Sequence, residues 1–319
     1  MSGSMVNQEG GVQARKLIIG ETRMKRSISI TCLLLVTAVG LNAQENAFPK
    51  LVGPYLGQKP PGKTAEPFGL GIVGLHQNLH SAMVFSPDGN EAYWKPGWNP
   101  REPIYTSRIE NGRWTAPKIA PFSAPNQGDD SPFFSPDGKK LYFLSQRTEQ
   151  GQETIWVMHR IQGGWSEPKP LPIRVESWRT HWQLSVDREQ NIFFGVGNYG
   201  EGGIIGDIYY SKYEDGQYGP PQKLGPAVNK AGDYNYSPFI APNGSYVLFT
   251  RSQEPARLYI SYRKKDGTWT EGRNLSKVIN SDISQMPFVT VDGKYLFFTI
   301  GGRIQWVDAG FIEELRPEE

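Results

Sequence analysis

The sequence predicts an all-β protein made of repeated units, and three observations carry that prediction. The first is a five-residue motif, Phe85-Ser86-Pro87-Asp88-Gly89, which returns in full or degraded form four more times along the 319-residue chain. Its Asp or Asn falls at positions 88, 137, 187, 243 and 292, so the steps are 49, 50, 56 and 49 residues. Self-similarity at such a period indicates a repeat architecture.

The second observation is that each copy of the motif lies between two short apolar runs. In the second copy, Ser131-Pro-Phe-Phe leads into the turn and Leu141-Tyr-Phe-Leu follows it. Apolar runs around a Pro-Asp-Gly turn predict a β-hairpin. Pro presets φ, Asp bonds to nearby backbone N–H groups, and Gly takes a positive φ cheaply. The repeated Asp is therefore expected to cap its turn, and not to catalyse a reaction or hold a metal.

The third observation is a further apolar run in each repeat, followed in four of them by a turn and an aromatic residue. Ile155-Trp-Val-Met and then Gly163-Gly-Trp165 are the example in the second repeat. Each repeat thus supplies about four short strands, and four-stranded antiparallel units at this period are propeller blades. We expect a β-propeller of five blades, with six blades as the alternative if the N-terminal segment builds one more.

The fifth repeat lacks its last strand, because Trp306-Val-Asp-Ala lies close to the end of the sequence. We predict that the segment near Pro67-Phe-Gly-Leu-Gly-Ile supplies the missing outer strand. That strand would close the ring and cover a sheet edge that could otherwise aggregate. Phe311–Leu315 is expected to form a short helical turn or a strand on the outside.

The F-S-P-D-G-x-x-x-Y-F core of the second repeat resembles the WD40-like PD40 repeats of TolB-type propellers. The segment that starts at Trp269-Thr-Glu-Gly and the ending from Trp306 to Pro317 resemble one exported bacterial subgroup of these propellers. The resemblance covers nearly all of the chain after about residue 65. It implies a propeller fold and export, and because that subgroup has no settled activity it implies little about chemistry.

The N-terminus reads as a secretory signal over residues 24–43. Met24-Lys-Arg is a basic start, residues 27–41 are largely apolar, and Ala43 offers a small residue before Gln44. Residues 1–23 are then a non-native or mis-started leader, and 44–319 form a single periplasmic or secreted propeller domain. An uncleaved N-terminal anchor is the alternative. The apolar run is too short to predict a membrane span, and none is expected after cleavage.

Charge and cysteine content exclude several functions. The net charge of +2 and the absence of a basic run argue against nucleic-acid binding. Cys32, the one cysteine, falls inside the predicted signal. The mature chain would therefore have no disulfide, no cysteine nucleophile and no thiolate metal site. We expect a monomer.

The candidate site lies where each inner strand begins, eight to six positions before the turn Asp or Asn. These positions hold His80-Ser81-Ala82, Asp129-Asp130-Ser131, Arg179-Thr180-His181, Asn235-Tyr236-Ser237 and Ser284-Gln285-Met286. The ends of the next strands should reach the same face, and they hold Lys95, Trp98, Arg147, Asn198, Tyr199, Arg251 and Arg303. A few convergent polar groups in a concave place are typical of a ligand site.

Arginines give this set its first interpretation, a pocket for an anionic ligand. Arg147, Arg251 and Arg303 are predicted at similar positions in three blades, and guanidinium forks match carboxylate or sulfate geometry. The predicted ligand-binding residues are Arg147, Arg179, Arg251, Arg303, Trp98, Tyr199, Tyr236 and Gln285. The alternative is that each arginine pairs with a neighbouring Asp or a strand-end carbonyl.

Histidines give the second interpretation, an acid–base site. His80 and His181, with Asp130, are the predicted catalytic residues, because imidazole titrates near neutral pH. Neighbours on a strand point to opposite faces, so at most one of Asp129 and Asp130 should face the channel. Structural hydrogen bonding is the alternative for each His. A divalent metal is the one cofactor considered, but the four His form no evident cluster and no metal ligand is assigned.

Three functions remain open at this point. The first is binding of an anionic small molecule, an acidic glycan or a cell-envelope component on the channel face. The second is a carbohydrate-active enzyme, either a polysaccharide lyase or a glycoside hydrolase. The third is a TolB-like scaffold that binds an envelope protein.

Overall fold

The Pro-Asp-Gly segments form tight turns between antiparallel strands, as their residue types predict. The computed structural model describes residues 48–318 except 74–78, 98, 100, 149, 150, 152, 176–178, 201, 202, 253 and 254. The side chains of residues 179–182, 198–200, 203 and 204 also lie outside the description. The predicted leader and signal sequence, residues 1–43, fall outside the described residues.

The described part of the chain is nearly all β, in several antiparallel sheets. Five successive four-stranded groups run, from first strand to fourth, as follows. They are β2 (Val84–Phe85), β3 (Glu91–Trp94), β4 (Tyr105–Glu110) and β6 (Lys118–Ile119); β7 (Asp130–Phe134), β8 (Lys140–Ser145), β9 (Thr154–Ile161) and β11 (Lys169–Pro170); β12 (Arg179–Val186), β13 (Ile192–Gly200), β14 (Gly203–Ser211) and β17 (Gln222–Lys223); β18 (Tyr234–Ile240), β19 (Tyr246–Ser252), β20 (Ala256–Tyr262) and β21 (Arg273–Asn274); and β22 (Gln285–Val289), β23 (Tyr295–Ile300), β24 (Arg303–Asp308) and β1 (Glu66–Pro67).

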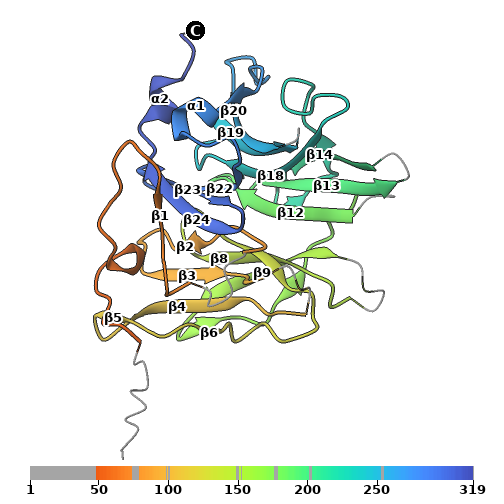
Figure 1. Cartoon of the computed structure of the whole chain (residues 1–319). Helices are drawn as coiled ribbons and strands as arrows, with labels where there is room; N and C mark the ends of the chain where they lie inside the picture. Colours follow the sequence, from red (N-terminus) through yellow and green to blue (C-terminus); the bar gives the residue numbers. More distant parts are fainter. Residues whose placement is uncertain are drawn as a thin grey trace, which may run out of the picture. The chain divides into compact units, whose positions relative to one another are not determined.

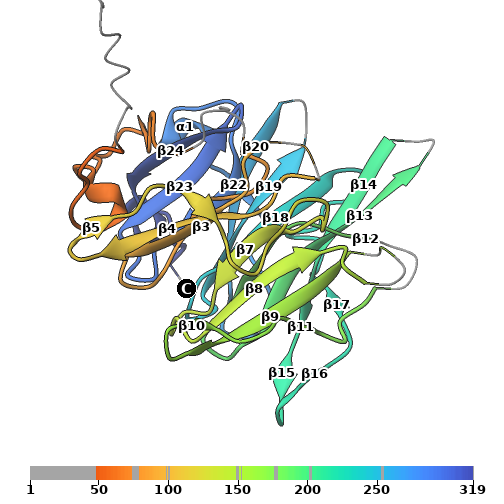
Figure 2. The ribbon, with the colours of Figure 1, turned by 90° about the horizontal axis from the view of Figure 1, so that it is seen from below.

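Short elements extend these groups. They are β5 (Arg113–Trp114), β10 (Gly164–Trp165), the hairpin of β15 (Tyr213–Glu214) and β16 (Gln217–Tyr218), the 3-10 turn η1 (Tyr55–Gly57), and the helices α1 (Ser276–Ile279) and α2 (Phe311–Glu314). A single parallel pair, Gly206 with Tyr234, joins the third and fourth groups. Figures 1 and 2 show the arrangement, and in Figure 2 the first strands β7, β18 and β22 lie toward the middle while β9, β14 and β24 lie further out.

The N-terminal segment supplies the outer strand of the last group. Glu66 pairs with Trp306, and the backbone N–H of Phe68 donates to the carbonyl of Ile304 at 3.0 Å. The prediction that the segment near Pro67 fills this position is therefore confirmed. Phe311–Glu314 is a short helix, as one of the two predictions for it required.

Four of the five turns are capped by the Asp or Asn of the motif. Asp88 accepts hydrogen bonds from the Ser86 hydroxyl at 2.5 Å and from the Asn90 backbone N–H at 3.1 Å. Asp137, Asn243 and Asp292 each accept from the backbone N–H two residues later. Burial raises the pKa of Asp88, but these hydrogen bonds outweigh burial and hold that pKa below its usual value.

The third turn corrects the predicted alignment of the repeats. The backbone N–H of Asp187 donates to Asn191 across the turn, as Ser135 does to Lys140 in the second repeat. Asp187 thus occupies the position of Ser135, not of Asp137, and this turn is one residue shorter. Counted from this turn, the residues of β12 consequently shift by two positions, so Gln183 is the equivalent of Ser131, and both have a positive φ.

Aromatic side chains fill the centre beyond the strand ends that carry the predicted site. Phe133, Phe239 and Phe288 come from β7, β18 and β22 and are almost fully buried. Their ring centroids lie 6.1, 6.1 and 5.9 Å apart. Because three different groups of strands contribute to this aromatic cluster, the middle of the protein is packed there.

Candidate functional site

Asp129 and Asp130 lie side by side in the chain and face different surroundings. The carboxylate of Asp129 has no exposed surface and accepts hydrogen bonds from the hydroxyls of Ser123 at 2.7 Å and Ser145 at 2.6 Å. Both of its oxygens also lie 2.6 Å from Nη2 of Arg147. Asp129 therefore has all of its partners within its own group of strands and the loop before it.

Arg147 and Arg251 make similar internal contacts. Nη2 of Arg147 donates to the Phe122 carbonyl at 3.0 Å, and its guanidinium lies over the rings of Phe143 and Trp156. Arg251 is 3% exposed; it donates through Nε to Asn235 Oδ1 and through Nη2 to the Val228 carbonyl, both at 2.9 Å. Nε of Arg251 also lies 3.7 Å from Asp233. These contacts match the alternative interpretation of the arginines, in which each pairs with a neighbouring Asp or a strand-end carbonyl.

The three arginines do not share one register position. Arg251 lies on β19 and pairs with Arg257, whereas Arg147 follows the end of β8. Arg303 begins the third strand of its group, where it is exposed and pairs with Ile300. The expectation that these arginines occupy similar positions is therefore wrong, because sequence spacing did not reveal where each second strand ends.

Asp130 faces the other way and meets residues of the first repeat. One of its oxygens, Oδ2, is hydrogen-bonded to Nδ1 of His80 and lies 3.9 Å from Nζ of Lys95. The other, Oδ1, accepts from the Ser131 backbone N–H at 2.6 Å. The backbone N–H of His80 also donates to the Lys95 carbonyl at 3.2 Å. We call these three residues, His80, Lys95 and Asp130, the His80 cluster.

A β-bulge sets the direction of Asp130. The pairing of β7 with β8 shifts between Asp130 and Phe133, and Ser131 takes a φ of +48°. The same irregularity occurs in β12, β18 and β22, with φ of +59°, +50° and +57° at Gln183, Ser237 and Met286. Bulges commonly re-aim a side chain next to a functional site. None of these four residues is glycine, so the sequence carried no signal for them.

The cluster combines an ionised carboxylate with a buried ammonium. Burial raises the pKa of Asp130, but attraction to His80 and Lys95 and the hydrogen bonds from His80 and Ser131 outweigh burial and hold the pKa below its usual value. The Lys95 side chain is 2% exposed, and the ion pair at 3.9 Å is its one charged contact with a described residue. No described residue accepts a hydrogen bond from Nζ, although an ammonium has three donors.

The remaining predicted residues fall into two sets. Tyr236 and Gln285 occupy the same register position as Asp130 in their own strands, just before the bulge, which supports their inclusion in one face. Tyr236 is buried and its ring stacks on that of Tyr234, with centroids 4.5 Å apart. The side chains of Arg179, His181 and Tyr199, and all of Trp98, lie outside the described residues.

Lys95 was not predicted to bind a ligand. The sequence pattern indicated only that it lies at the end of a strand. Its signal is a lysine that directly follows a strand, Glu91–Trp94, in which every residue is buried. Lysine is almost never fully buried without a partner, so one in this position points to a function or to an ion pair.

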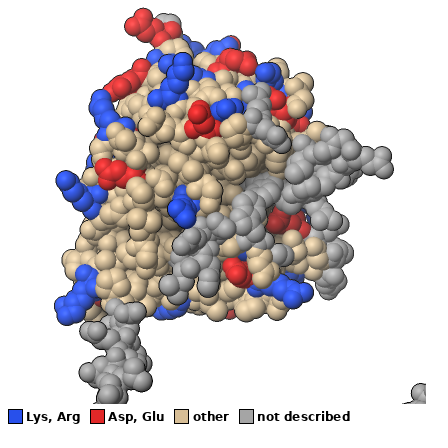
Figure 3. All heavy atoms as spheres, in the orientation of Figure 1, with Lys and Arg blue, Asp and Glu red and all other residues tan. Residues whose placement is uncertain are grey.

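The described residues give no indication of a metal site or of a membrane-spanning helix. Within them, no group of three or more His, Cys, Asp or Glu side chains could hold a metal ion. Nor does this part of the chain contain a helix long and apolar enough to cross a membrane. On the face drawn in Figure 3, acidic and basic side chains are interspersed, so charge does not mark a site there.

Comparisons with known proteins give no family. No protein-family model and no curated protein matches the chain. Solved structures with similar folds include TolB from Acinetobacter baumannii, with 15% identity, a TM-score of 0.46, and coverage of 73% of this chain and 55% of that one. The chain thus spans about half the length of that TolB.

Two further solved structures are similar at the same level. An endo-arabinase from Bacteroides thetaiotaomicron shows 15% identity and a TM-score of 0.47, over 77% of this chain and 95% of that one. A protein of unknown function from Dyadobacter fermentans shows 13% identity and a TM-score of 0.47, over 73% and 80% of the two chains. These likenesses are in keeping with a propeller-like fold, and with TM-scores below 0.5 they carry no argument about chemistry.

Proposed function

We propose that residues 44–319 form an exported five-bladed β-propeller, closed by β1, that binds a small anionic ligand at the His80 cluster. The five four-stranded groups and the pairing of β1 with β24 support the blade count and the closure. The predicted signal sequence supports a periplasmic or secreted location. The ligand class is a carboxylate-bearing saccharide, such as the end of an acidic glycan of the cell envelope.

The buried ammonium of Lys95 is the observation that carries this proposal. A buried charge is costly unless it is paired and hydrogen-bonded, and the contact with Asp130 at 3.9 Å is an ion pair without a hydrogen bond. A ligand carboxylate would supply acceptors to this ammonium. Such charge-assisted hydrogen bonds contribute roughly 1.5–3 kcal/mol each.

The test compares Lys95→Met with Lys277→Met, a change of the same kind at an exposed position of α1. Binding of galacturonate and glucuronate, with galactose and glucose as neutral controls, is measured by calorimetry on the mature chain. We expect K95M to weaken binding of the uronates by about tenfold or more, and K277M to leave it unchanged. Equal uronate affinity in K95M and wild type, or no uronate binding at all, would contradict the proposal.

A proton-transfer enzyme is the second candidate, favoured by the hydrogen bond between His80 and Asp130. A carboxylate bound to Nδ1 orients an imidazole and leaves proton exchange with a substrate to Nε2. In a uronate lyase, His80 would remove the proton next to the substrate carboxylate while Lys95 balances the developing charge. The electrons of that C–H bond form a C=C double bond as the glycosidic C–O bond breaks, and the leaving oxygen takes a proton from water. The unsaturated product absorbs ultraviolet light.

The assay for this candidate follows that absorbance with pectate, alginate and heparin-type substrates. His80→Asn should abolish product formation and leave uronate binding within about threefold of wild type, because the amide keeps one polar contact. Binding by the wild type without any product would reject the enzyme and leave the binding function standing.

A further inference from the structure

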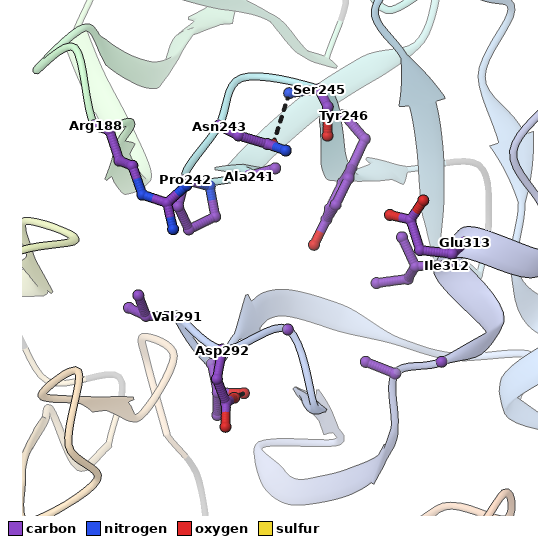
Figure 4. Close-up of a pocket in the computed structure, with 14 residues that line it drawn as sticks. Arg188, Ala241, Pro242, Asn243, Ser245, Tyr246, Val291, Asp292, Ile312 and Glu313 are labelled. Atoms are coloured by element: carbon purple, nitrogen blue, oxygen red, sulfur yellow. Dashed lines mark hydrogen bonds between the residues drawn. The ribbon is translucent and has the colours of Figure 1, made fainter.

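A polar pocket lies among the turns, at the ends of the inner strands opposite to the His80 cluster. It is a cavity of about 280 Å³ between the fourth turn, the fifth turn and the segment 309–313 that includes the start of α2. Arg188, from the third turn, completes it (Figure 4). Pockets for drug-sized ligands begin at roughly 300 Å³, so an occupant of this cavity would be smaller.

Tyr246 directs a polar atom into this pocket. The residue is 6% exposed, and its ring packs near the rings of Phe239 and Tyr262. Figure 4 shows its hydroxyl pointing into the cavity, and no described residue is hydrogen-bonded to that hydroxyl. Buried tyrosine hydroxyls usually have a partner. Burial raises the pKa of Tyr246 well above its usual value, so the hydroxyl keeps its proton and can donate.

Donors gather on one side of the pocket. The guanidinium of Arg188 projects beside Pro242 (Figure 4), and no described carboxylate pairs with it. The backbone N–H of Arg188 donates to the Pro242 carbonyl at 2.8 Å, which anchors the loop. Asn243 uses its Oδ1 to accept from the Ser245 N–H at 3.1 Å, so its side-chain NH₂ can donate elsewhere.

Two carboxylates also border the cavity: Figure 4 places Glu313 across it from Arg188, and Asp292 on a third side with its carboxylate directed away from the middle. Asp292 accepts from the Thr290 hydroxyl at 2.6 Å and lies 2.9 Å from Nζ of Lys294. Glu313 pairs with Arg316 at 2.8 Å. A carboxylate has about four acceptor sites, so both can accept further hydrogen bonds. One side of the pocket therefore has a guanidinium with no described carboxylate partner. The opposite side, called the acidic side below, has the Glu313 carboxylate, which is paired with Arg316.

We propose that this turn-end pocket binds a small zwitterion of amino-acid size. Arg188 and the Asn243 amide would take its carboxylate, and Glu313 would take its ammonium. The Tyr246 hydroxyl, which lies between the two sides, would bond to either end. This binding site is independent of the His80 cluster and of the ligand proposed there.

The experiment titrates wild type, Arg188→Gln and Tyr246→Phe with glycine, serine, glutamate and lysine by calorimetry. Ethylamine and propionate serve as probes with only one of the two charges. Arg273→Gln, an exposed change on β21 outside the pocket, is the matched control. We expect one or more amino acids to bind wild type and R273Q equally, with R188Q weaker by about tenfold or more and Y246F by about three- to tenfold.

Each other outcome overturns the proposal. If propionate binds as tightly as the amino acids, the ligand is an anion and the acidic side has no role. If R188Q and Y246F bind as wild type does, the amino acid binds elsewhere. If none of the four amino acids binds, the pocket does not recognise this class. Melting temperatures of both variants show whether a loss of binding comes from a loss of fold.

Discussion

Asp129 and Asp130 are adjacent in the chain and both are buried, but their carboxylates contact different sets of residues. Asp129 faces the interior of its own group of strands, where two hydroxyls and Arg147 use its oxygens. Asp130 faces the first repeat, where its neighbours are the imidazole of His80 and the ammonium of Lys95. The carboxylate that is fully engaged by its neighbours is part of the packing. The one beside an ammonium that lacks acceptors is the better candidate for a ligand site.

Of the substitutions considered, removal of the Asp129 carboxylate should lower the free energy of unfolding the most. Asp129→Ala leaves Arg147 without its carboxylate and the Ser123 hydroxyl without its acceptor. Breaking a buried ion pair costs about 3–5 kcal/mol, so the free energy of unfolding in urea should fall by about that amount. Asp137→Ala, which removes an exposed turn cap, should cost about 1 kcal/mol and serves as the control. A loss in D129A no larger than in D137A would show that Asp129 is not the structural carboxylate.

Asp130→Asn should cost less and should show a distinctive pH dependence. The folded pKa of Asp130 lies below its unfolded value of about 3.9, so ionised Asp130 stabilises the fold above that pH. That stabilisation is lost as the pH falls through the folded pKa. We expect D130N to lower the free energy of unfolding by about 1–3 kcal/mol at pH 6.

The difference between wild type and D130N should then shrink between pH 4 and pH 2. Urea unfolding at pH 6, 4, 3 and 2 measures it. A difference that stays constant over this range would mean that the ionised carboxylate of Asp130 does not stabilise the folded state.

Asp187→Ser should have the smallest effect and the opposite sign. Asp187 is buried and forms no ion pair with a described residue, and burial raises its pKa although Asn191 donates to it. A raised carboxyl pKa destabilises the fold above the unfolded value of about 3.9, and the penalty disappears below that pH. Ser restores the residue found at this position in the first two turns.

D187S should therefore be more stable than wild type at pH 7 by up to about 1 kcal/mol, and no more stable at pH 3. Thermal unfolding at the two pH values decides this. A variant less stable than wild type at pH 7 would place Asp187 with Asp129, as a carboxylate whose hydrogen bonds outweigh its burial.

The sequence allowed the strands to be predicted, because turn chemistry and apolar runs act locally. The outer strand near Pro67 was predicted for a different reason: the fifth repeat lacks its last strand, and this segment precedes the first hairpin. The third repeat was misaligned because its turn is one residue shorter, and Asp187 resembles the motif Asp while occupying the Ser position.

The site could be predicted only in part. His80 and Asp130 were predicted to share one face, because their positions before the inner strands follow from the repeat, and they are hydrogen-bonded to each other. The arginines were not placed, because a long side chain can reach several places from one backbone position. Arg251 turns inward to Asn235 and a loop carbonyl, and only the packing determines that choice. The bulge that sets the direction of Asp130 occurs at a Ser, and the equivalent bulges in the other strands occur at Gln, Ser and Met. These residue types have no preference for positive φ.

The pairing of β1 with β24 has a consequence for how the protein is made. Glu66 pairs with Trp306, which is separated from it in sequence by almost the whole described length of the chain, so β1 has no partner until that residue is made. Contacts this distant in sequence slow folding, since the loop between them must close first. During synthesis β1 is made long before β24, the strand with which it pairs. Until β24 is made, β1 has no partner strand in its own chain and can be contacted by other chains.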